Sequence, residues 1–299
     1  MAYSDFKAAS LLRLLPAVLR ARDFHLYLEG GKRLVDLWRW GGRAILGHKP
    51  PKVLLELKNA AERGLFCPLP HPLERRFFKA LGGFFPDRAF HLYLNENSLY
   101  QALAGAGFSS PPHDPAFPSR NDARANGEKA RVSIWRPFLD SVLEAPASKE
   151  ATTSEQPPAS ILVPVLPFAF APAVLVLPQS MDNTFPPGEL IPPAVLAPAA
   201  RSLFNLAAAL KTIDKNHEEN QENRLQQMYP KVRKALAKSI WRRRSIYLTV
   251  EPSMNADEYA ALFKRFFEGG FLIPPSPSEP AVLPLAMSAG EEAKLADLL

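Results

Sequence analysis

Proline and basic residues are distributed so unevenly along this chain that they constrain its fold more than any other feature. Twelve of the 31 prolines lie between Pro146 and Pro198, and residues 150–200 contain no lysine, arginine or histidine. Within this interval, residues 161–168 and 173–177 form continuous apolar runs bounded by prolines. Short runs of this kind are typical of strands that are buried on both faces of a sheet. We therefore expect the interval to supply core strands and loops of an α/β fold.

The same residues argue against a membrane protein. The uncharged run from Ile161 to Pro178 contains four prolines, and each proline removes a helical hydrogen bond that lipid cannot replace. At the N-terminus, Arg13 and Pro16 interrupt the apolar residues, which is not the pattern of a signal peptide. The single cysteine, Cys67, cannot form an internal disulfide, so nothing indicates an oxidising compartment. We expect a cytoplasmic protein without a membrane partner.

The first hundred residues predict a hairpin, two helices and a further strand. Residues 24–29 and 33–38 alternate in polarity and flank Gly30-Gly31, a pair that suits a tight turn. Apolar residues then recur at helical spacing over residues 51–61 and 72–81, with glycines after both segments. Residues 89–94 read as the next strand. The region is therefore expected to be α/β.

A sharper signal follows this strand. Ser98 and Gln101 have the spacing of a capping box, so we expect a short helix that begins at Ser98 and continues through Ala104. A strand, a turn and a helix N-terminus in succession bind phosphate groups in many folds. The sequence therefore predicts an anion site near Ser98.

The remainder predicts a loop-rich or disordered insert near residues 109–160 and then a smaller unit. The expected elements of that unit are an amphipathic helix over 198–211, a polar helix over 219–241 interrupted at Pro230, a strand over 246–250, a helix capped by Asn255, two short strands, and a final helix capped by Ser288 and Glu291. We expect a large α/β domain over residues 1–204, which includes an N-terminal segment like that of a small domain. A small α+β domain is expected over residues 205–299.

The order of these motifs resembles the class-III aminotransferases, which have the fold-type-I architecture of pyridoxal-phosphate-dependent transferases. The strongest match is Tyr27-Leu-Glu-Gly-Gly-Lys-Arg-Leu-Val-Asp36, followed by Leu46-Gly-His-Lys-Pro-Pro-Lys-Val53. That family begins with a hairpin around a glycine turn and continues with a Leu-Gly-His-x-x-Pro-x-Val helix start. Residues 95–103 are similar to its phosphate turn, and residues 242–248 and 268–291 are similar to its small domain. The resemblance covers about the first 105 and the last 70 residues, and it implies a large domain that is truncated in its centre.

The resemblance also implies a cofactor site. The family uses a lysine for the Schiff base, an acidic residue at the pyridinium nitrogen and a helix N-terminus for the phosphate of pyridoxal phosphate. Here Glu96-Asn97 replaces the usual Gly-Ser pair, and a carboxylate repels a phosphate. Asn97 and Ser98 remain the candidate cofactor-binding residues. Pro284 stands where the late strand of the family often carries a substrate-binding arginine.

The centre of the chain lacks the remaining parts. Residues 150–210 contain no lysine, and Asp182 is the only aspartate between Lys149 and Arg201. Lys211 is the candidate catalytic lysine. We expect a degenerate aminotransferase-like protein without transaminase activity, which binds no cofactor, acts as a scaffold or interaction protein, and forms a homodimer like the parent fold. The alternative is an active pyridoxal-phosphate-dependent aminotransferase with a relocated lysine, at Lys211 or Lys215.

Three other features suggest different chemistry. Cys67 and His71 are metal-ligand types, but two ligands without a second pair do not predict a zinc site. His48 is expected to shape the entry of the following helix rather than to act in acid–base chemistry. The basic tract at residues 231–244, in a chain of net charge +6, is interpreted as a solvated helix face, since no aromatic platform for base stacking accompanies it. A nucleic-acid partner is therefore not expected.

Overall fold

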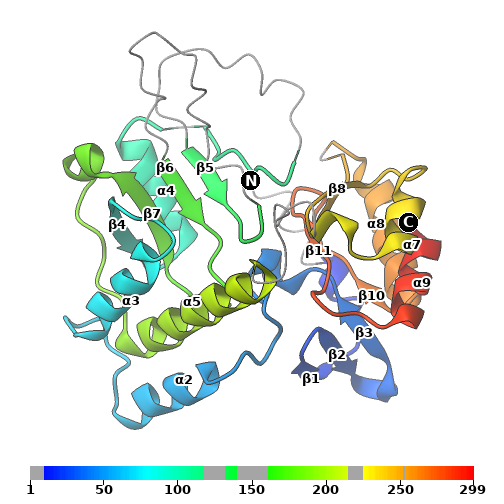
Figure 1. Cartoon of the computed structure of the whole chain (residues 1–299), viewed down its shortest axis with the longest axis horizontal. Coiled ribbons are helices and arrows are strands. Elements are labelled where there is room, and N and C mark those ends of the chain that lie inside the picture. Colours follow the sequence, from blue (N-terminus) through cyan, green and yellow to red (C-terminus); the bar gives the residue numbers. More distant parts are fainter. Residues whose placement is uncertain (1–9, 109, 118–131, 140–160, 215–224, 252) are drawn as a thin grey trace. The chain divides into compact units, whose positions relative to one another are not determined.

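The chain forms two compact units. The computed structural model describes residues 10–108, 110–117, 132–139, 161–214, 225–251 and 253–299 (Figure 1). Residues 51–212 form one unit, which we name the central unit. Residues 1–50 and 213–299 form the other, which we name the terminal unit because it contains both ends of the chain.

The central unit is built around a four-stranded sheet. Its strands are β4 (Arg88–Tyr93), β5 (Val132–Trp135), β6 (Ile161–Pro164) and β7 (Ala173–Pro178), in the order β4-β7-β6-β5. β7 is antiparallel to β4 and β6, whereas β5 and β6 are parallel. Residues 173–177 are all buried, so the prediction of core strands in the proline-rich interval is confirmed.

Helices pack on this sheet and on one another. They are α2 (Val53–Glu62), α3 (Leu73–Gly82), α4 (Glu96–Gly105) and α5 (Pro193–Asp214), and the short helix η3 (Gln179–Thr184) follows β7. Leu99 and Leu103 of α4 share a core with Leu175 and Leu177 of β7. Ala60 of α2 packs with alanines of α5 in a second, smaller cluster.

Helix α5 is long and apolar enough to cross a membrane over residues 193–212. However, 56% of that window is buried inside the fold, and Pro198 lies within the helix. Burial of this extent is what the core helix of a folded domain requires. We therefore assign α5 to the core of the central unit.

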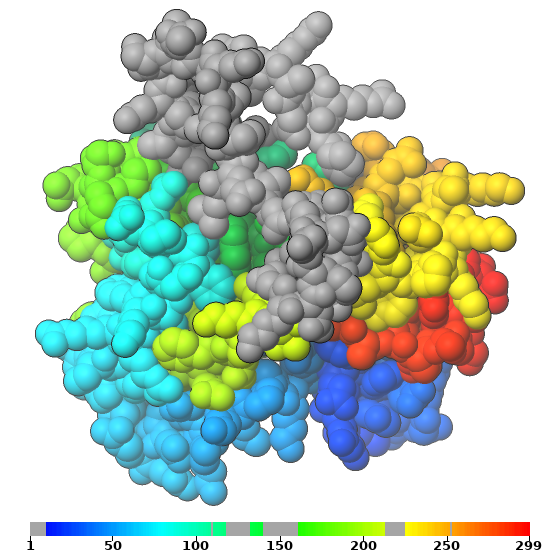
Figure 2. Space-filling model, viewed as in Figure 1, coloured from blue at the N-terminus to red at the C-terminus, as the bar shows by residue number. Residues whose placement is uncertain are grey.

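The terminal unit contains two sheets that combine both ends of the sequence. The first sheet has the strand order β1-β2-β3-β10 and consists of β1 (Val18–Arg22), β2 (His25–Leu28), β3 (Arg33–Asp36) and β10 (Phe271–Leu272). The second sheet has the strand order β11-β9-β8 and consists of β8 (Arg242–Arg244), β9 (Tyr247–Thr249) and β11 (Ala281–Val282). β3 and β10 are parallel, and the Val282 N–H donates to the Leu37 carbonyl at 2.7 Å. In Figure 2 the N-terminal segment (blue) accordingly lies against the C-terminal segment (red).

Most local predictions for this unit are confirmed. The short helix η1 (Glu29–Gly31) joins β2 and β3, with φ of 79° at Gly30 and 82° at Gly31. The helices are α7 (Pro230–Leu236), α8 (Ala256–Glu268) and α9 (Ala289–Leu298), and the short helix η2 spans Arg39–Gly42. Asn255 caps α8, and the capping box of Ser288 and Glu291 is present.

Two expectations differ from the structure, and one strand was not predicted. The expected boundary after residue 204 falls inside α5, because this helix continues to Asp214, and the first 50 residues join the C-terminal unit through the β3–β10 pairing. Of the expected helix over 219–241, residues 225–227 and α7 are helical, and the predicted interruption at Pro230 is confirmed. The helix ends at Leu236 rather than at 241, and Arg242–Arg244 forms a strand. β1 was not predicted. Of the insert near 109–160, residues 132–139 contain β5, whereas 118–131 and 140–160 lie outside the described residues.

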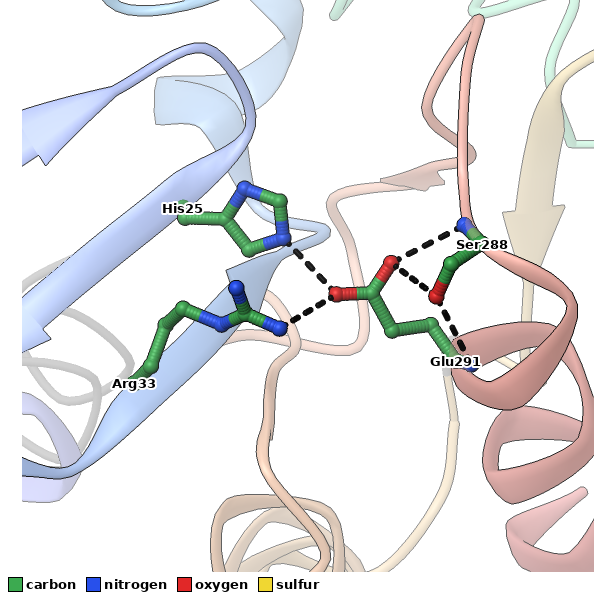
Figure 3. Close-up of polar contacts among 4 residues, drawn as sticks. All are labelled: His25, Arg33, Ser288 and Glu291. Atoms are coloured by element: carbon green, nitrogen blue, oxygen red, sulfur yellow. Dashed lines mark hydrogen bonds and ion pairs between the residues drawn. The ribbon is translucent and has the colours of Figure 1, made fainter.

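A carboxylate joins α9 to the N-terminal hairpin (Figure 3). Glu291 Oε1 lies 2.9 Å from His25 Nε2 and 3.0 Å from Arg33 Nη2, while Oε2 accepts from the backbone and the hydroxyl of Ser288. Burial tends to raise the pKa of Glu291, but the hydrogen bonds from Ser288 and His25 together outweigh it and lower the pKa below its ordinary value. The charged carboxylate therefore stabilises the folded unit.

This lowered pKa predicts a loss of stability in acid. A carboxyl group whose folded pKa lies below its unfolded value of about 4.3 stabilises the fold above that pH, and this contribution disappears as the pH falls through the folded pKa. We expect Glu291→Gln to lower the free energy of unfolding at pH 7 by about 1–2 kcal/mol and to have a smaller effect at pH 3. Urea unfolding at both pH values measures this difference. Glu268→Gln, at a carboxylate that is 64% exposed, is the matched control, and an equal loss from Glu291→Gln at both pH values would contradict the assignment.

Candidate functional site

The turn from β4 to α4 is the place where the sequence predicted an anion site. α4 begins at Glu96, and the Asn95 side chain caps it by accepting a hydrogen bond from the Ser98 N–H at 3.0 Å. The predicted capping box from Ser98 to Gln101 is therefore wrong, because Asn95 is itself a strong N-cap residue three positions earlier. Asn97 and Ser98 both lie in the first turn of α4.

The residues of this turn do not fit the phosphate of pyridoxal phosphate. The Ser98 N–H, one of the donors that a helix N-terminus offers to an anion, is already bonded to Asn95. The Glu96 carboxylate lies in the first turn as well, where it interacts favourably with the helix dipole and repels a second anion. Asn97 and Ser98 thus lie at the helix N-terminus next to a carboxylate that disfavours a phosphate.

The lysines of the central unit are also poorly placed for a Schiff base. Its described lysines, Lys52, Lys58, Lys79 and Lys211, are all exposed. Lys211 lies in the last turn of α5, and Lys215 lies outside the described residues. A Schiff-base lysine is activated by desolvation in an apolar pocket or by a neighbouring cation. None of the four exposed amines has a desolvated setting.

Asp182, the aspartate of the lysine-free interval, is bonded to a histidine of β4. Asp182 Oδ1 lies 2.8 Å from His91 Nε2, and His91 Nδ1 lies 3.0 Å from the Pro186 carbonyl oxygen. His91 is buried, so the ring ties η3 and the following segment to the sheet. This half-exposed carboxylate holds η3 to β4, the edge strand of the sheet.

Two polar residues near the end of β4, Tyr93 and Glu189, were not predicted from the sequence. The Tyr93 side chain is buried, and its hydroxyl has no hydrogen-bond partner within the described residues. Burial, and then the charge of Glu189, raise the pKa of Tyr93. Glu189 Oε2 accepts from the Leu94 N–H at 2.6 Å. The only sequence signal was the position of Tyr93 at the end of a strand, which gives no indication of burial.

Asp36 and His48, which belong to the two segments that most strongly resemble the family, lie next to each other in the terminal unit. Asp36 Oδ2 lies 2.9 Å from His48 Nε2, and Asp36 Oδ1 accepts from the N–H groups of Trp38 and Arg39 at 2.9 Å each. Arg39 is buried, donates to the Asp36 and Ile45 carbonyls and lies over the Phe24 ring. Burial lowers the pKa of Arg39 to about 10, which leaves it protonated at neutral pH. His48 thus fixes the chain before α2, as predicted.

Pro284, which stands where the family often carries a substrate-binding arginine, makes a hydrogen bond through its backbone carbonyl. The Pro284 carbonyl accepts from the Tyr229 hydroxyl at 2.7 Å, and burial raises the pKa of Tyr229 to about 12. Tyr229 is therefore an uncharged donor at neutral pH. This contact holds the segment before α7 to the late strand.

The basic tract is not one solvated helix face. Arg243 is partly buried and donates to the carbonyls of Leu225, Met228 and Ser245, which ties β8 to the preceding turn. Lys231 and Lys234 are exposed on α7, and Lys238 lies beyond its end. The interpretation as a helix face is correct only for α7, because residues 242–244 form a strand instead.

The remaining candidate does not form a metal site. Cys67 is exposed, and His71 Nδ1 accepts from the Leu73 N–H at the start of α3. Within the described residues, no group of three or more histidine, cysteine, aspartate or glutamate side chains could hold a metal ion.

Comparisons with known proteins show which fold this chain shares. No family model matches the chain. An uncharacterised protein of Treponema pallidum is 26% identical over 296 residues, an alignment that covers 92% of this chain and 91% of that protein. Glutamate-1-semialdehyde 2,1-aminomutase of Thermus thermophilus is 27% identical over 115 residues, which cover 38% of this chain and 27% of the enzyme. The solved structure of ornithine δ-aminotransferase from Plasmodium falciparum superimposes with a TM-score of 0.63 at 12% identity, covering 99% of this chain and 96% of that one.

The architecture therefore agrees with the resemblance found in the sequence. Solved structures that share this architecture include acetylornithine aminotransferase and glutamate-1-semialdehyde aminomutase. The present chain has 299 residues. The chain is a divergent, shortened protein with the fold-type-I architecture of the class-III, pyridoxal-phosphate-dependent aminotransferases.

Proposed function

We propose that this protein has no transaminase activity and acts as a scaffold or interaction protein. The observation that carries the proposal is the exposure of Lys52, Lys58, Lys79 and Lys211, the lysines described in the central unit. Transamination requires a lysine amine that is held and desolvated at the cofactor. The Asn95 cap and the Glu96 carboxylate further weaken the place where the cofactor phosphate would bind.

Retention of the folded core supports a non-catalytic role. The central sheet is packed by α4, and Glu291, Asp36 and Arg39 are all engaged in specific contacts in the terminal unit. The Treponema pallidum protein aligns over nine tenths of both chains, so its length is similar. A second protein of this length supports a shortened fold that is maintained for a purpose other than the chemistry of longer enzymes.

Absorbance with added pyridoxal phosphate tests the proposal. We expect the spectrum of free cofactor, with no aldimine band and no change when an amino-acid donor is added. An aldimine band that disappears in Lys211→Ala would instead establish the alternative, an active aminotransferase with a relocated lysine. Lys58→Ala, at an exposed lysine paired with Glu62, is the matched control for nonspecific reaction of surface amines.

We also propose that the protein is a homodimer. Four large apolar side chains of α2 and the segment after it are more than half exposed: Leu54 (59%), Leu55 (54%), Phe66 (60%) and Leu69 (63%). Apolar side chains that gather on a surface mark protein–protein contact sites. Helix α2 packs inward through Val53 and Ala60. Its exposed residues Leu54 and Leu55 are therefore available to a partner subunit.

Charge on this face is expected to separate the subunits. The double variant Leu54→Glu/Leu55→Glu places two carboxylates where a dimer would bury leucines, and we expect a dissociation constant at least tenfold higher, since each buried charge costs more than about 1.4 kcal/mol. Light scattering across a concentration series measures it. Phe170→Glu, at a side chain that is 73% exposed in the β6–β7 connection, should leave the dimer intact. A wild-type chain that is monomeric at all concentrations would disprove the proposal.

A further inference from the structure

The terminal unit contains a cavity that none of the proposed functions uses. Its volume is about 290 Å³. Its apolar walls include Leu12 and Leu15 from the segment before β1, Leu26 from β2 and Leu272 from β10. A ligand site is usually a concave, mostly apolar space with a few polar groups that orient the ligand. The cavity has these apolar walls within one unit.

The polar part of the cavity is supplied by Asp36 and His48. The Asp36 carboxylate is buried and already accepts from two backbone N–H groups, and its Oδ2 atom lies 2.9 Å from His48 Nε2. The Nδ1 atom of His48 has no partner within the described residues, and the ring lines the cavity. A neutral imidazole that carries its proton on Nε2, beside Asp36, leaves Nδ1 as an acceptor for an N–H or O–H group of a ligand.

Two indole rings complete the wall. Trp38 Nε1 donates to Glu279 Oε2 at 2.7 Å, and the centroids of the Trp38 and Trp40 rings lie 5.1 Å apart. Trp40 has a positive φ of 53° and is 55% exposed at the cavity. A left-handed conformation is strained for a tryptophan, and strain of this kind is concentrated at ligand sites. The two indole planes are inclined by 46°, so a flat ring stacked on one of them would meet the other at an angle.

We propose that this cavity binds a small, uncharged aromatic molecule that hydrogen-bonds to His48 Nδ1. An apolar cavity of about 150 Å³ already accommodates benzene, so a volume near 290 Å³ suits one or two fused rings. Both Asp36 oxygens already face partners, Oδ1 two backbone N–H groups and Oδ2 the His48 ring, so a charge on the ligand would be desolvated without a free counterion. The aliphatic walls and the two indoles favour a planar apolar ring, and His48 selects a ring that carries one polar N–H or O–H group.

Binding of indole is the test. Indole has two fused rings and one N–H group, and titration followed by ¹⁵N NMR of the intact protein reports both affinity and the site. We expect saturable binding with a shift of the His48 ring nitrogen. Leu15→Phe, which fills the cavity, should weaken binding at least tenfold, whereas Leu14→Phe, at an exposed leucine outside the cavity wall, should leave it unchanged.

Three results would overturn the proposal. One is indole binding that Leu15→Phe and Leu14→Phe weaken equally. Another is naphthalene binding as tightly as indole with no shift of the His48 ring nitrogen, which would exclude the hydrogen bond. The third is a change of oligomeric state in Leu15→Phe alone, which would identify the cavity as a contact for a second copy of the chain. The amide spectrum of each variant shows whether it has folded.

Discussion

Replacement of Asp114 by asparagine is expected to lower the free energy of unfolding of the central unit by about 3 kcal/mol. Asp114 forms a bidentate ion pair with Arg136, with distances of 2.8 Å from Nε to Oδ1 and 2.6 Å from Nη2 to Oδ2. The two side chains are 14% and 6% exposed. Asparagine removes the negative charge and turns an amide donor or a weaker acceptor toward the guanidinium. The loss is large because the Arg136 charge stays buried without its counterion.

A double-mutant cycle separates this pair from a general packing defect. Arg136→Met removes the buried cation, and in that background Asp114→Asn should cost at least about 1.5 kcal/mol less than in the wild type. Hydrogen exchange of β5 peptides across a urea gradient reports the stability of the central unit. Equal costs of Asp114→Asn in both backgrounds would show that the ion pair is not the source of the effect.

Gly47→Ala is expected to destabilise the terminal unit by about 3 kcal/mol. Gly47 has φ of +90°, and a Cβ atom added there would lie 2.9 Å from the Asp23 backbone oxygen. The Asp23 carbonyl also accepts from the His48 N–H at 2.8 Å, so relief of the clash would disturb the segment that holds His48 to Asp36. Strain and close contact therefore act together, which explains glycine in the Leu-Gly-His motif.

Gly31→Ala provides the control for Gly47→Ala. Gly31 has a similar φ of +82°, and nothing lies within 4 Å of an added Cβ atom. This variant should lose only the cost of a left-handed conformation, about 1–2 kcal/mol. Urea unfolding of both variants, followed by hydrogen exchange of β2 and β3 peptides, gives the comparison. Losses of equal size would mean that the approach to Asp23 has no energetic consequence.

The sequence predicts most of the fold because its elements carry local signals. The apolar runs of β6 and β7, the Gly30-Gly31 turn, and the caps at Asn255 and Ser288 each act within a few residues. Long-range pairing has no such signal. The division between the units differs from the predicted one because β3 pairs in parallel with β10 and because α5 continues to Asp214. Neither feature follows from local composition.

The candidate site was predictable only in position. The structure has the predicted strand, turn and helix start, but Asn95, not Ser98, caps the helix, since either residue is an acceptable N-cap. The Asp114–Arg136 pair and the buried Tyr93 hydroxyl depend on partners 22 residues away or on tertiary burial, which one sequence does not reveal.

The proposed lack of transaminase activity rests most directly on the proline-rich interval. It supplies β6 and β7 to the central sheet while providing no lysine from residue 150 to residue 210. The most direct measurement is the intact mass of the protein after incubation with pyridoxal phosphate and reduction with borohydride. We predict an unchanged mass at stoichiometric cofactor. A mass increase of one reduced cofactor, mapped by peptide analysis to a single lysine, would contradict the absence of transaminase chemistry.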